Sequence, residues 1–388
     1  MRVSAQSGAE RPSRVSVEGR FDYGSSASSE PPLSANKLMN TFLLYGSYGY
    51  TGQLILDLAV QNGLRPLLAG RDEARLKAQA GQYGLDYRVI SLDNSAALDS
   101  ALREVDAVLH CAGPFVLTFR QMAEACLRTR RHYVDISGEI EGFEALAALD
   151  SEARAAGIMM LPGAGFDVVP TDCLAAHLQR RLPTATRLRL FIRSVGAGVS
   201  RGTAKSGIEN MHRGGRIRRD GKIVSVPPAW RTLYADFGRG PVQTVSIGWG
   251  DVSTAYHSTG IPNVETYMAF PGAMVDALYL TRWFGPLMYS RPMKSLLQSL
   301  LNLAPPGPDG QARQRGRALI VGEVSDATGK VVRSRLQTSE GYSFTAQATV
   351  EVMKRILGLD LRTGFQTPSQ AYGADFVLQF PNVKREDL

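Results

Sequence analysis

The stretch that decides the fold is TFLLYGSYGYTGQLILDLAV, residues 41–60. A short apolar run over 41–47 leads into glycines at positions 46, 49 and 52, and a segment with helical apolar spacing follows over 50–62. Glycines between a buried strand and a helix permit a tight turn and let the backbone approach a phosphate closely. The amide groups at the helix start can then bind that anion. This order of elements predicts a Rossmann domain with a dinucleotide on the loop.

The glycine spacing is GxxGxxG, a variant of the GxGxxG fingerprint that is weak when it stands alone. A chance cluster of glycines is the alternative, but further strands follow in register and argue against it. We expect the whole loop to contact the cofactor, through Gly46, Ser47, Tyr48, Gly49, Tyr50, Thr51 and Gly52.

Beyond the loop, short apolar runs alternate with helical segments. The predicted strands are 65–70, 86–92, 107–113, 132–137 and 158–163, and the predicted helices are 72–82, 95–104, 119–129 and 140–156. Apolar strands that alternate with helices are typical of a parallel sheet covered on both faces. The first half of the chain therefore predicts an α/β fold with a doubly wound Rossmann sheet.

The pattern changes near residue 166. The predicted elements are a helix over 168–181, a strand over 186–195, strands in the glycine-rich stretch 222–270, helical segments over 272–303, a hairpin around Ala-Thr-Gly at 327–329, and a helix over 342–357. Strands joined by tight turns favour antiparallel pairing. We therefore expect a second, α+β domain built on a largely antiparallel sheet.

Four parts follow from this division. Residues 1–38 are rich in Ser, Gly, Pro and Arg, a composition typical of disorder, so we expect a disordered arm. We expect the Rossmann domain over 39–165 and a substrate or oligomerisation domain over 166–340. The last part, 341–388, is expected to be a helix and tail that pack back on the Rossmann domain.

The second and fourth predicted strands suggest how the cofactor is recognised. Arg71 follows the second strand, where enzymes that prefer NAD usually place an acid, and a guanidinium there can pair with a 2′-phosphate. Asp72 is explained as a helix N-cap. NADP(H) is therefore favoured over NAD(H). The fourth strand ends in Ala112, Gly113 and Pro114, which we expect beside the nicotinamide, with Phe115 towards the substrate; an ordinary strand-to-helix turn is the alternative.

The composition excludes several classes of protein. With 44% hydrophobic and 21% charged residues the chain reads as globular, and a net charge of +8 suits acidic or phosphorylated ligands. Three cysteines without a CxxC pair fit a reducing compartment, so a cytoplasmic location is expected. The five histidines lack metal-ligand spacing, and no apolar run is long enough to span a membrane, so we expect neither a metal nor a spanning helix.

Hydride transfer also needs a group that stabilises charge on the acceptor and a proton source. No tyrosine has a lysine four residues on, which excludes the short-chain dehydrogenase dyad. The catalytic candidates are Lys205, Tyr256 and His257, the last two by residue type only. Asp135 and Thr203 are candidates for the substrate side, although a turn cap and an exposed helix start explain them equally well.

Two basic segments bear on partners. The cluster over 212–219 carries no aromatic residue, so it predicts no nucleic-acid site. Residues 276–303 carry an apolar stripe together with basic residues, and such a stripe suits peripheral contact with a membrane or a lipid. A core position or a homodimer contact is the alternative. We otherwise expect a small-molecule or acyl substrate.

Several motifs together resemble those of a known family. YGSYGYTG, LAGR, CAGPF, HYVDISGE and PGAGFDVVPTD, between residues 45 and 172, resemble the saccharopine dehydrogenase-like family. Segments 200–209, 251–265, 305–324 and 340–353 are similar to its bacterial branch, which includes trans-acting enoyl reductases. The resemblance implies a pyridine nucleotide and a second domain over the nicotinamide, but no single substrate.

Three functions follow as expectations. The first is an NADP(H)-dependent reductase of an enoyl or other conjugated intermediate. The second is a saccharopine-type dehydrogenase that acts on a C–N bond of an amino acid, which would need arginines aimed at carboxylates. The third is a non-enzymatic, lipid-associated protein that retains the Rossmann fold.

Overall fold

The predicted first strand is β1 (Phe42–Tyr45), and all four of its residues are buried. Successive side chains of a strand point to opposite faces of a sheet. Phe42 and Leu44 accordingly pack into one apolar cluster, and Leu43 and Tyr45 pack into another. Burial on both faces is typical of a central strand in a parallel sheet with helices on both sides.

The computed structural model describes residues 40–196, 198–210, 214–272, 274–276, 278–279 and 290–388. The arm predicted over 1–38, His212 and Arg213 of the basic cluster, and residues 280–289 of the predicted apolar stripe lie outside the described residues.

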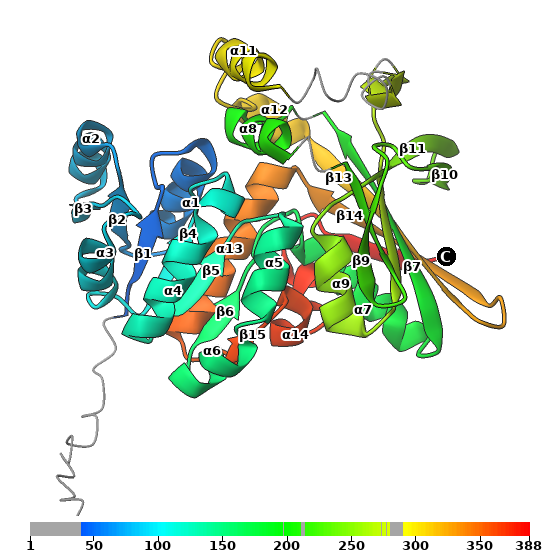
Figure 1. Cartoon of the computed structure of the whole chain (residues 1–388), viewed down its shortest axis with the longest axis horizontal. Helices are drawn as coiled ribbons and strands as arrows, with labels where there is room; N and C mark the ends of the chain where they lie inside the picture. The colour runs from blue at the N-terminus through cyan, green and yellow to red at the C-terminus, as the bar shows by residue number, and fades with distance from the viewer. Residues whose placement is uncertain (1–39, 197, 211–213, 273, 277, 280–289) are drawn as a thin grey trace, which may run out of the picture. The chain divides into compact units, whose positions relative to one another are not determined.

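Sheet A has seven parallel strands in the order β15-β6-β5-β4-β1-β2-β3 (Figure 1). Its strands are β1, β2 (Leu67–Gly70), β3 (Tyr87–Val89), β4 (Ala107–His110), β5 (His132–Asp135), β6 (Met159–Leu161) and β15 (Gly364–Phe365). The strand order reverses between β1 and β4, and parallel sheets bind their ligands outside the carboxyl ends of strands at such a reversal. The predicted Rossmann sheet is confirmed.

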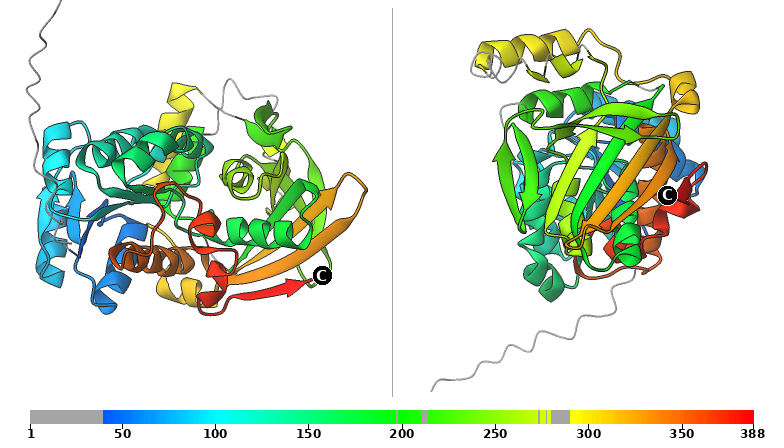
Figure 2. Two further views of the ribbon diagram at one scale, coloured as in Figure 1. Left: turned by 90° about the horizontal axis from the view of Figure 1, so that it is seen from below. Right: turned by 90° about the vertical axis from the view of Figure 1, so that its right-hand side faces the viewer.

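Helices cover both faces of sheet A. They are α1 (Tyr50–Gln61), α2 (Glu73–Tyr83), α3 (Ser95–Leu102), α4 (Phe119–Thr129), α5 (Ile140–Ala147), α6 (Asp150–Ala156) and α13 (Gly341–Leu357), with a 3₁₀ turn η1 (Phe115–Leu117) before α4. Helices α3 and α4 pack on the side of Leu43, and α1 and α13 pack on the side of Phe42. The left view of Figure 2 shows α13, in orange-brown, on one side of the sheet and the teal helices on the other.

The single helix predicted over 140–156 is wrong, because the chain forms α5 and α6 with a break at Leu149. Asp150 begins α6 and accepts a hydrogen bond at Oδ1 from the amide of Phe365, 2.8 Å away in β15. Its Oδ2 atom pairs with Arg154 at 2.8 Å. The contact between Asp150 and Phe365 joins residues 215 positions apart, so the local periodicity of the sequence could not reveal it.

Sheet B contains nine strands. They are β7 (Ala185–Val195), β8 (Gly215–Arg219), β9 (Lys222–Val226), β10 (Thr232–Asp236), β11 (Pro241–Ile247), β12 (Asn263–Met268), β13 (Arg317–Asp326), β14 (Val331–Ser339) and β16 (Lys384–Asp387). The β7–β12 pair is parallel and the other pairs are antiparallel. The largely antiparallel second sheet is therefore confirmed, including the hairpin of β13 and β14.

The remaining helices are α7 (Val169–Arg181), α8 (Arg201–Asn210), α9 (Asp251–Thr259), α11 (Arg291–Leu301), α12 (Gly310–Arg315) and α14 (Pro368–Tyr372), with a 3₁₀ turn η3 (Phe376–Gln379). Helix α9 lies in a stretch predicted to be strands. It ends at Gly260, which has a left-handed backbone with φ +73°, a common helix end. Helices α8 and α11 pack against each other at the top of Figure 1.

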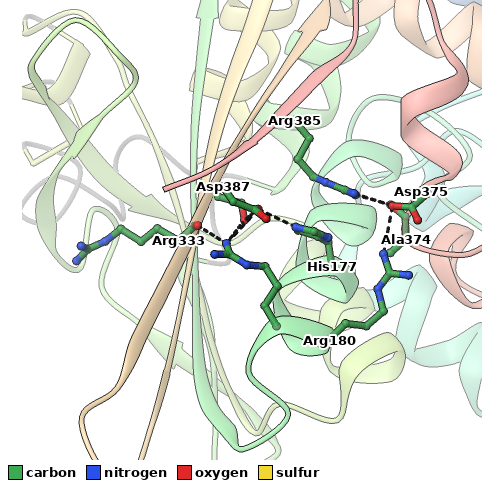
Figure 3. Close-up of polar contacts among 9 residues, drawn as sticks. His177, Arg180, Arg333, Ala374, Asp375, Arg385 and Asp387 are labelled. Atoms are coloured by element: carbon green, nitrogen blue, oxygen red, sulfur yellow. Dashed lines mark hydrogen bonds and ion pairs between the residues drawn. The ribbon is translucent and has the colours of Figure 1, made fainter.

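Charged contacts link the C-terminal strand and the segment before it to α7. Asp387 in β16 lies 2.8 Å from His177 Nε2 and 3.0 Å from Arg181, both in α7 (Figure 3). Asp375 binds Arg385 at 2.7 Å and Arg180 at 3.2 Å. Exposed ion pairs contribute little stability singly, so we expect the backbone pairing of β16 with β14 to dominate and the charges to set its position.

Candidate functional site

The glycine loop joins β1 to α1 by a tight turn. Gly46 has φ +83°, a backbone conformation that favours glycine, and its amide binds the Ala69 carbonyl at 2.8 Å. A Cβ at this position would lie 3.0 Å from Ala112 Cβ. The first glycine therefore lets the loop lie directly against the end of β4.

The other two glycines have different surroundings. A Cβ on Gly52 would lie 2.9 Å from Ser47 O and 3.0 Å from Ser47 Cα, so this glycine lets α1 pack closely on the loop. A Cβ on Gly49 would meet only the Gly46 carbonyl oxygen, at 3.2 Å. The space in front of Gly49 is open, and the first amides of α1 have no partner within the helix. A pyrophosphate fits this space, so the loop is suited to a dinucleotide.

The remaining loop residues divide between the cofactor side and internal packing. Ser47 is buried and its hydroxyl has no hydrogen-bond partner, while Thr51 is half-buried. The Tyr50 hydroxyl donates to the Pro308 carbonyl at 2.5 Å and accepts from Arg313 at 3.1 Å. Tyr50 therefore anchors the segment before α12 to the start of α1.

Tyr48 connects the glycine loop to the end of β2. Its hydroxyl accepts the amides of Arg71 at 3.0 Å and Asp72 at 3.3 Å. Its ring lies over Gly70, where a Cβ would come within 2.5 Å of Tyr48 Cε1. Arg71 is exposed beside this contact. Asp72 caps α2 by accepting the Arg75 amide at 3.1 Å, as the sequence predicted.

The turn after β4 is held by a buried carboxylate. The turn contains a cis peptide bond between Gly113 and Pro114. Glu139, which directly precedes α5, accepts the Phe115 amide at 3.0 Å and the Val116 amide at 2.6 Å. Burial raises the pKa of Glu139. Glu139 thus holds the residues that directly follow Ala112, Gly113 and Pro114, and these three lie at the carboxyl edge of the sheet, where a nicotinamide is expected.

Asp135, a candidate for substrate contact, is 1% exposed at the end of β5. Its Oδ1 atom accepts the amides of Ser137 at 2.9 Å and Gly163 at 2.8 Å, and its Oδ2 atom accepts the Tyr133 hydroxyl at 2.6 Å. Burial raises its pKa to about 6. These contacts give Asp135 a direct role in joining the loops that follow β5 and β6.

Thr203 belongs to a hydroxyl network at the start of α8. Its side chain lies 2.9 Å from the Tyr342 hydroxyl and 3.1 Å from the Ser200 hydroxyl. The Ser200 amide donates to the same Tyr342 oxygen at 2.6 Å. The Tyr342 ring meets the Tyr50 ring edge-on, with centroids 5.1 Å apart. The network therefore links α8 and α13 to the first turn of α1, the helix that follows the glycine loop.

Lys205, two residues further along α8, lines a groove of about 380 Å³ together with Pro114. Leu117 of η1 and Glu209 of α8 also line it, and α11 with the residue after it supplies the opposite wall: Ser295, Gln298, Ser299 and Asn302. The structure thus brings two sequence candidates together, the turn after β4 and the lysine of α8. The groove opens next to the position expected for the nicotinamide.

Tyr256 and His257 do not line this groove. Both lie in α9, where Tyr256 faces the Arg218 guanidinium at 4.2 Å. His257 Nε2 lies 3.3 Å from Glu144, and its ring packs on Phe365 of β15. Burial raises the pKa of Glu144, but hydrogen bonds from His257 and Ser253 and the charge of Arg218 outweigh it and hold the pKa at about 2. These contacts are characteristic of an internal ion-pair cluster.

Two further residues near the site were not among the sequence candidates. Arg75 lies in the first turn of α2, and a basic residue so close after Arg71 is a usable signal. Asp167 directly precedes Val168, the N-cap of α7, which has no side-chain cap. Burial and the nearby Glu139 carboxylate raise the pKa of Asp167 to about 7, so it can hold a proton at neutral pH.

The family comparison agrees with this geometry. Residues 42–161 match the saccharopine dehydrogenase NADP binding domain. This part of the chain is therefore similar to the NADP-binding domain of saccharopine dehydrogenases. The match covers the glycine loop, the end of β2 and the turn after β4, and it confirms both the suspected resemblance and NADP(H) as the cofactor.

The similar proteins carry unlike descriptions. A trans-acting enoyl reductase of Mycobacterium leprae is 31% identical over 158 residues, which cover 39% of this chain and 38% of that protein. A lipid droplet localized protein of Caenorhabditis elegans is 26% identical over 144 residues, 34% of each protein. The chain therefore matches little more than a third of the length of these relatives.

The fold extends further than the sequence similarity. Saccharopine dehydrogenase (L-Glu forming) of Saccharomyces cerevisiae superposes with a TM-score of 0.61 at 14% identity, over 90% of this chain and 99% of that chain. Both sheets therefore belong to one known architecture. Among the residues that the structure describes, no helix has the length and apolar content needed to cross a membrane.

Proposed function

We propose that this protein is an NADP(H)-dependent oxidoreductase that transfers a hydride between the nicotinamide and a conjugated carbonyl substrate held in the groove of Lys205. The observation that carries the proposal is that Lys205 and Pro114 line one groove. Pro114 lies in the turn that follows β4, at the edge of the sheet where the nicotinamide is expected. A substrate in this groove can therefore reach both the cofactor and a cation.

The residues around the groove have distinct tasks in this proposal. The bound, reduced nicotinamide supplies a hydride to an electron-poor carbon. Lys205 stabilises negative charge that develops on the carbonyl oxygen of the substrate. Glu139 keeps the Phe115 and Val116 amides in place and so orients the turn after β4. Asp167 has a pKa of about 7 but does not line the groove, so the proton that completes the reduction would come from solvent.

The walls of the groove favour one substrate class. The described residues that line it are mostly polar, and Lys205 is their only cation. Recognition of an amino diacid by a saccharopine-type enzyme would call for several guanidinium groups. One lysine and one glutamate among hydroxyl and amide side chains suit an uncharged carbonyl or thioester group instead. This contrast supports an enoyl or related acyl substrate, such as the relatives named as enoyl reductases suggest.

The test measures consumption of NADPH by its ultraviolet absorbance. A 2-enoyl thioester is compared with a keto acid plus an amino acid, the reductive pair of a saccharopine-type enzyme. We expect turnover with the thioester only. Lys205→Met should lower kcat/KM by about 100-fold, the scale of losing one charge-stabilising group. Lys222→Met, which removes an exposed lysine of β9 outside the groove, should leave it unchanged.

Turnover of the amino acid pair alone would replace this proposal by the saccharopine-type function. No turnover with either class, in protein that binds NADPH, would favour a non-enzymatic role. Equal activity of wild type and Lys205→Met would remove Lys205 from the chemistry.

The outer face of α11 supports a second proposal, contact with an anionic lipid surface. Leu296, Leu300 and Leu303 follow one another at helical spacing and are 53%, 53% and 84% exposed. The sequence over 277–308 holds Arg282, Arg291 and Lys294 but no acidic residue. Lys294 pairs with Glu209 of α8, so the charge that complements anionic headgroups comes from the two arginines. The wild-type protein should sediment together with vesicles in which about a third of the lipid is phosphatidylserine. The double variant Leu296→Ser, Leu300→Ser should not sediment with them.

Two outcomes would contradict the lipid contact. Sedimentation that is the same for wild type and the double variant would exclude α11 as the lipid-binding face. A wild-type dimer in solution that the double variant converts to a monomer would show that a second copy of the chain covers these leucines instead.

A further inference from the structure

The end of β2 carries a pair of arginines that the glycine loop helps to position. Arg75, in the first turn of α2, places its guanidinium 4.6 Å above the centre of the Tyr48 ring. Its Nη2 atom donates to the Tyr48 carbonyl oxygen at 2.7 Å. Arg75 is exposed, and a guanidinium has five N–H donors. The donors not used on Tyr48 can therefore reach a ligand.

Other polar groups at this edge are already engaged. The Tyr48 hydroxyl accepts the amides of Arg71 and Asp72. The Asp72 carboxylate accepts the Arg75 amide at 3.1 Å. Enzymes that prefer NAD use an acid near this place to bind the ribose hydroxyls. Here the acid caps α2 instead, and the cationic side chains of Arg71 and Arg75 remain for a ligand, with the exposed Glu73 as the one acid between them in the sequence that does not cap the helix.

The geometry points to Arg75 as the residue that selects the cofactor: held on the face of Tyr48, it binds the 2′-phosphate of NADP(H) together with Arg71. A planar guanidinium fixed by a ring and one hydrogen bond loses little freedom when it pairs with a phosphate. Gly70 is part of this arrangement, because any Cβ there would displace the Tyr48 ring. The inference rests on the proposed function only in requiring the dinucleotide to lie on the glycine loop.

The experiment measures dissociation constants of NADPH and NADH for the full chain by fluorescence titration. Arg75→Ala should raise the dissociation constant of NADPH by about 10- to 100-fold, the scale of a hydrogen bond to a charged group. NADH, which lacks the 2′-phosphate, should change by less than about 3-fold. Arg75→Lys should recover only part of the loss, because an ammonium lacks the planar fork.

Two further variants separate causes. Lys77→Ala removes an exposed cation of the same helix two positions away, which faces another direction, and it should leave both constants unchanged. Tyr48→Phe keeps the ring but removes the hydroxyl that accepts the two amides. It should weaken NADPH less than Arg75→Ala does, because the guanidinium keeps its ring contact.

The outcomes distinguish this inference from the assignment on which it rests. Wild-type protein that binds neither nucleotide would overturn the cofactor site itself. Wild-type protein that binds NADPH normally, while Arg75→Ala weakens both nucleotides equally or neither, would overturn the role of Arg75. Equal losses of NADPH affinity in Arg75→Ala and Lys77→Ala would overturn the specific role of Arg75, because the loss of any positive charge on α2 would then explain the effect.

Discussion

Valine at Gly49 and valine at Gly52 should have opposite consequences, although the two glycines lie three residues apart in one loop. At Gly52 the new Cβ would overlap the Gly46 carbonyl oxygen and lie 2.9 Å from Ser47 O. Both are backbone atoms that cannot swing away. Overpacking of this kind costs about 1–3 kcal/mol or more. Gly52→Val should therefore lower Tm by roughly 1–4 °C, since the shift per kcal/mol is small for a body of this size.

At Gly49 the new Cβ meets a single atom, the Gly46 carbonyl oxygen, at 3.2 Å. The backbone there has φ −70° and ψ 162°, which valine can adopt. Gly49 is also the N-cap of α1, where a residue without a capping group costs about 1 kcal/mol. Stability should thus change little. The side chain would fill the open space in front of the helix start and should weaken NADPH by at least about 100-fold, the equivalent of about two charge-assisted hydrogen bonds.

The assay combines thermal unfolding with NADPH titration for both variants and the wild type. The reasoning predicts a stable Gly49→Val protein that does not bind NADPH and a destabilised Gly52→Val protein. A stable Gly49→Val protein with normal NADPH affinity would refute the placement of the pyrophosphate. If both variants lost stability equally, the contrast between the two sites would be wrong.

Three further changes test the surroundings of the site. Glu144→Gln should destabilise the protein at pH 7, because it removes the charge partner of Arg218, whose side chain is 3% exposed. Since the pKa of Glu144 is held at about 2, the Tm difference between wild type and variant should shrink as pH falls from about 4.5 towards 2. A Tm difference that stays constant with pH would contradict this. The Tm of Asp251→Asn should rise relative to the wild-type Tm as pH rises from about 4 to 8, because burial raises the pKa of Asp251 to about 8 and ionisation of the buried carboxyl destabilises the fold. A Tm difference that does not change with pH would count against this. Tyr50→Phe should cost about 1 kcal/mol by losing the Pro308 contact, and an unchanged Tm would show that this contact is not stabilising.

The sequence predicted the Rossmann sheet well because its local signals agree. Each central strand is a short, fully buried apolar run, such as β1 and β4, and each is followed by a turn and an amphipathic helix. The glycine loop is also local, since its three glycines have their roles within residues 46–52. The end of the Rossmann domain and the other domain boundaries stay predictions.

The features that sequence reasoning missed depend on distant contacts. At the break between α5 and α6, Asp150 binds the amide of Phe365, 215 positions away in the sequence. Helix α9 was hidden in a strand-rich region, although Gly260 marks its end. Arg75 gains its meaning only from Tyr48, 27 positions away. Tyr256 and His257 were chosen by residue type alone, and type does not show that they lie beside Arg218 and Glu144.

A crystal structure of the NADP⁺ complex would show directly whether NADP(H) lies across the carboxyl edge of sheet A. The pyrophosphate should lie in front of Gly49 and the 2′-phosphate between Arg71 and Arg75. The nicotinamide should lie beside Gly113 and Pro114, facing the groove of Lys205. A nicotinamide placed away from that groove, or a dinucleotide bound elsewhere on the chain, would contradict the account.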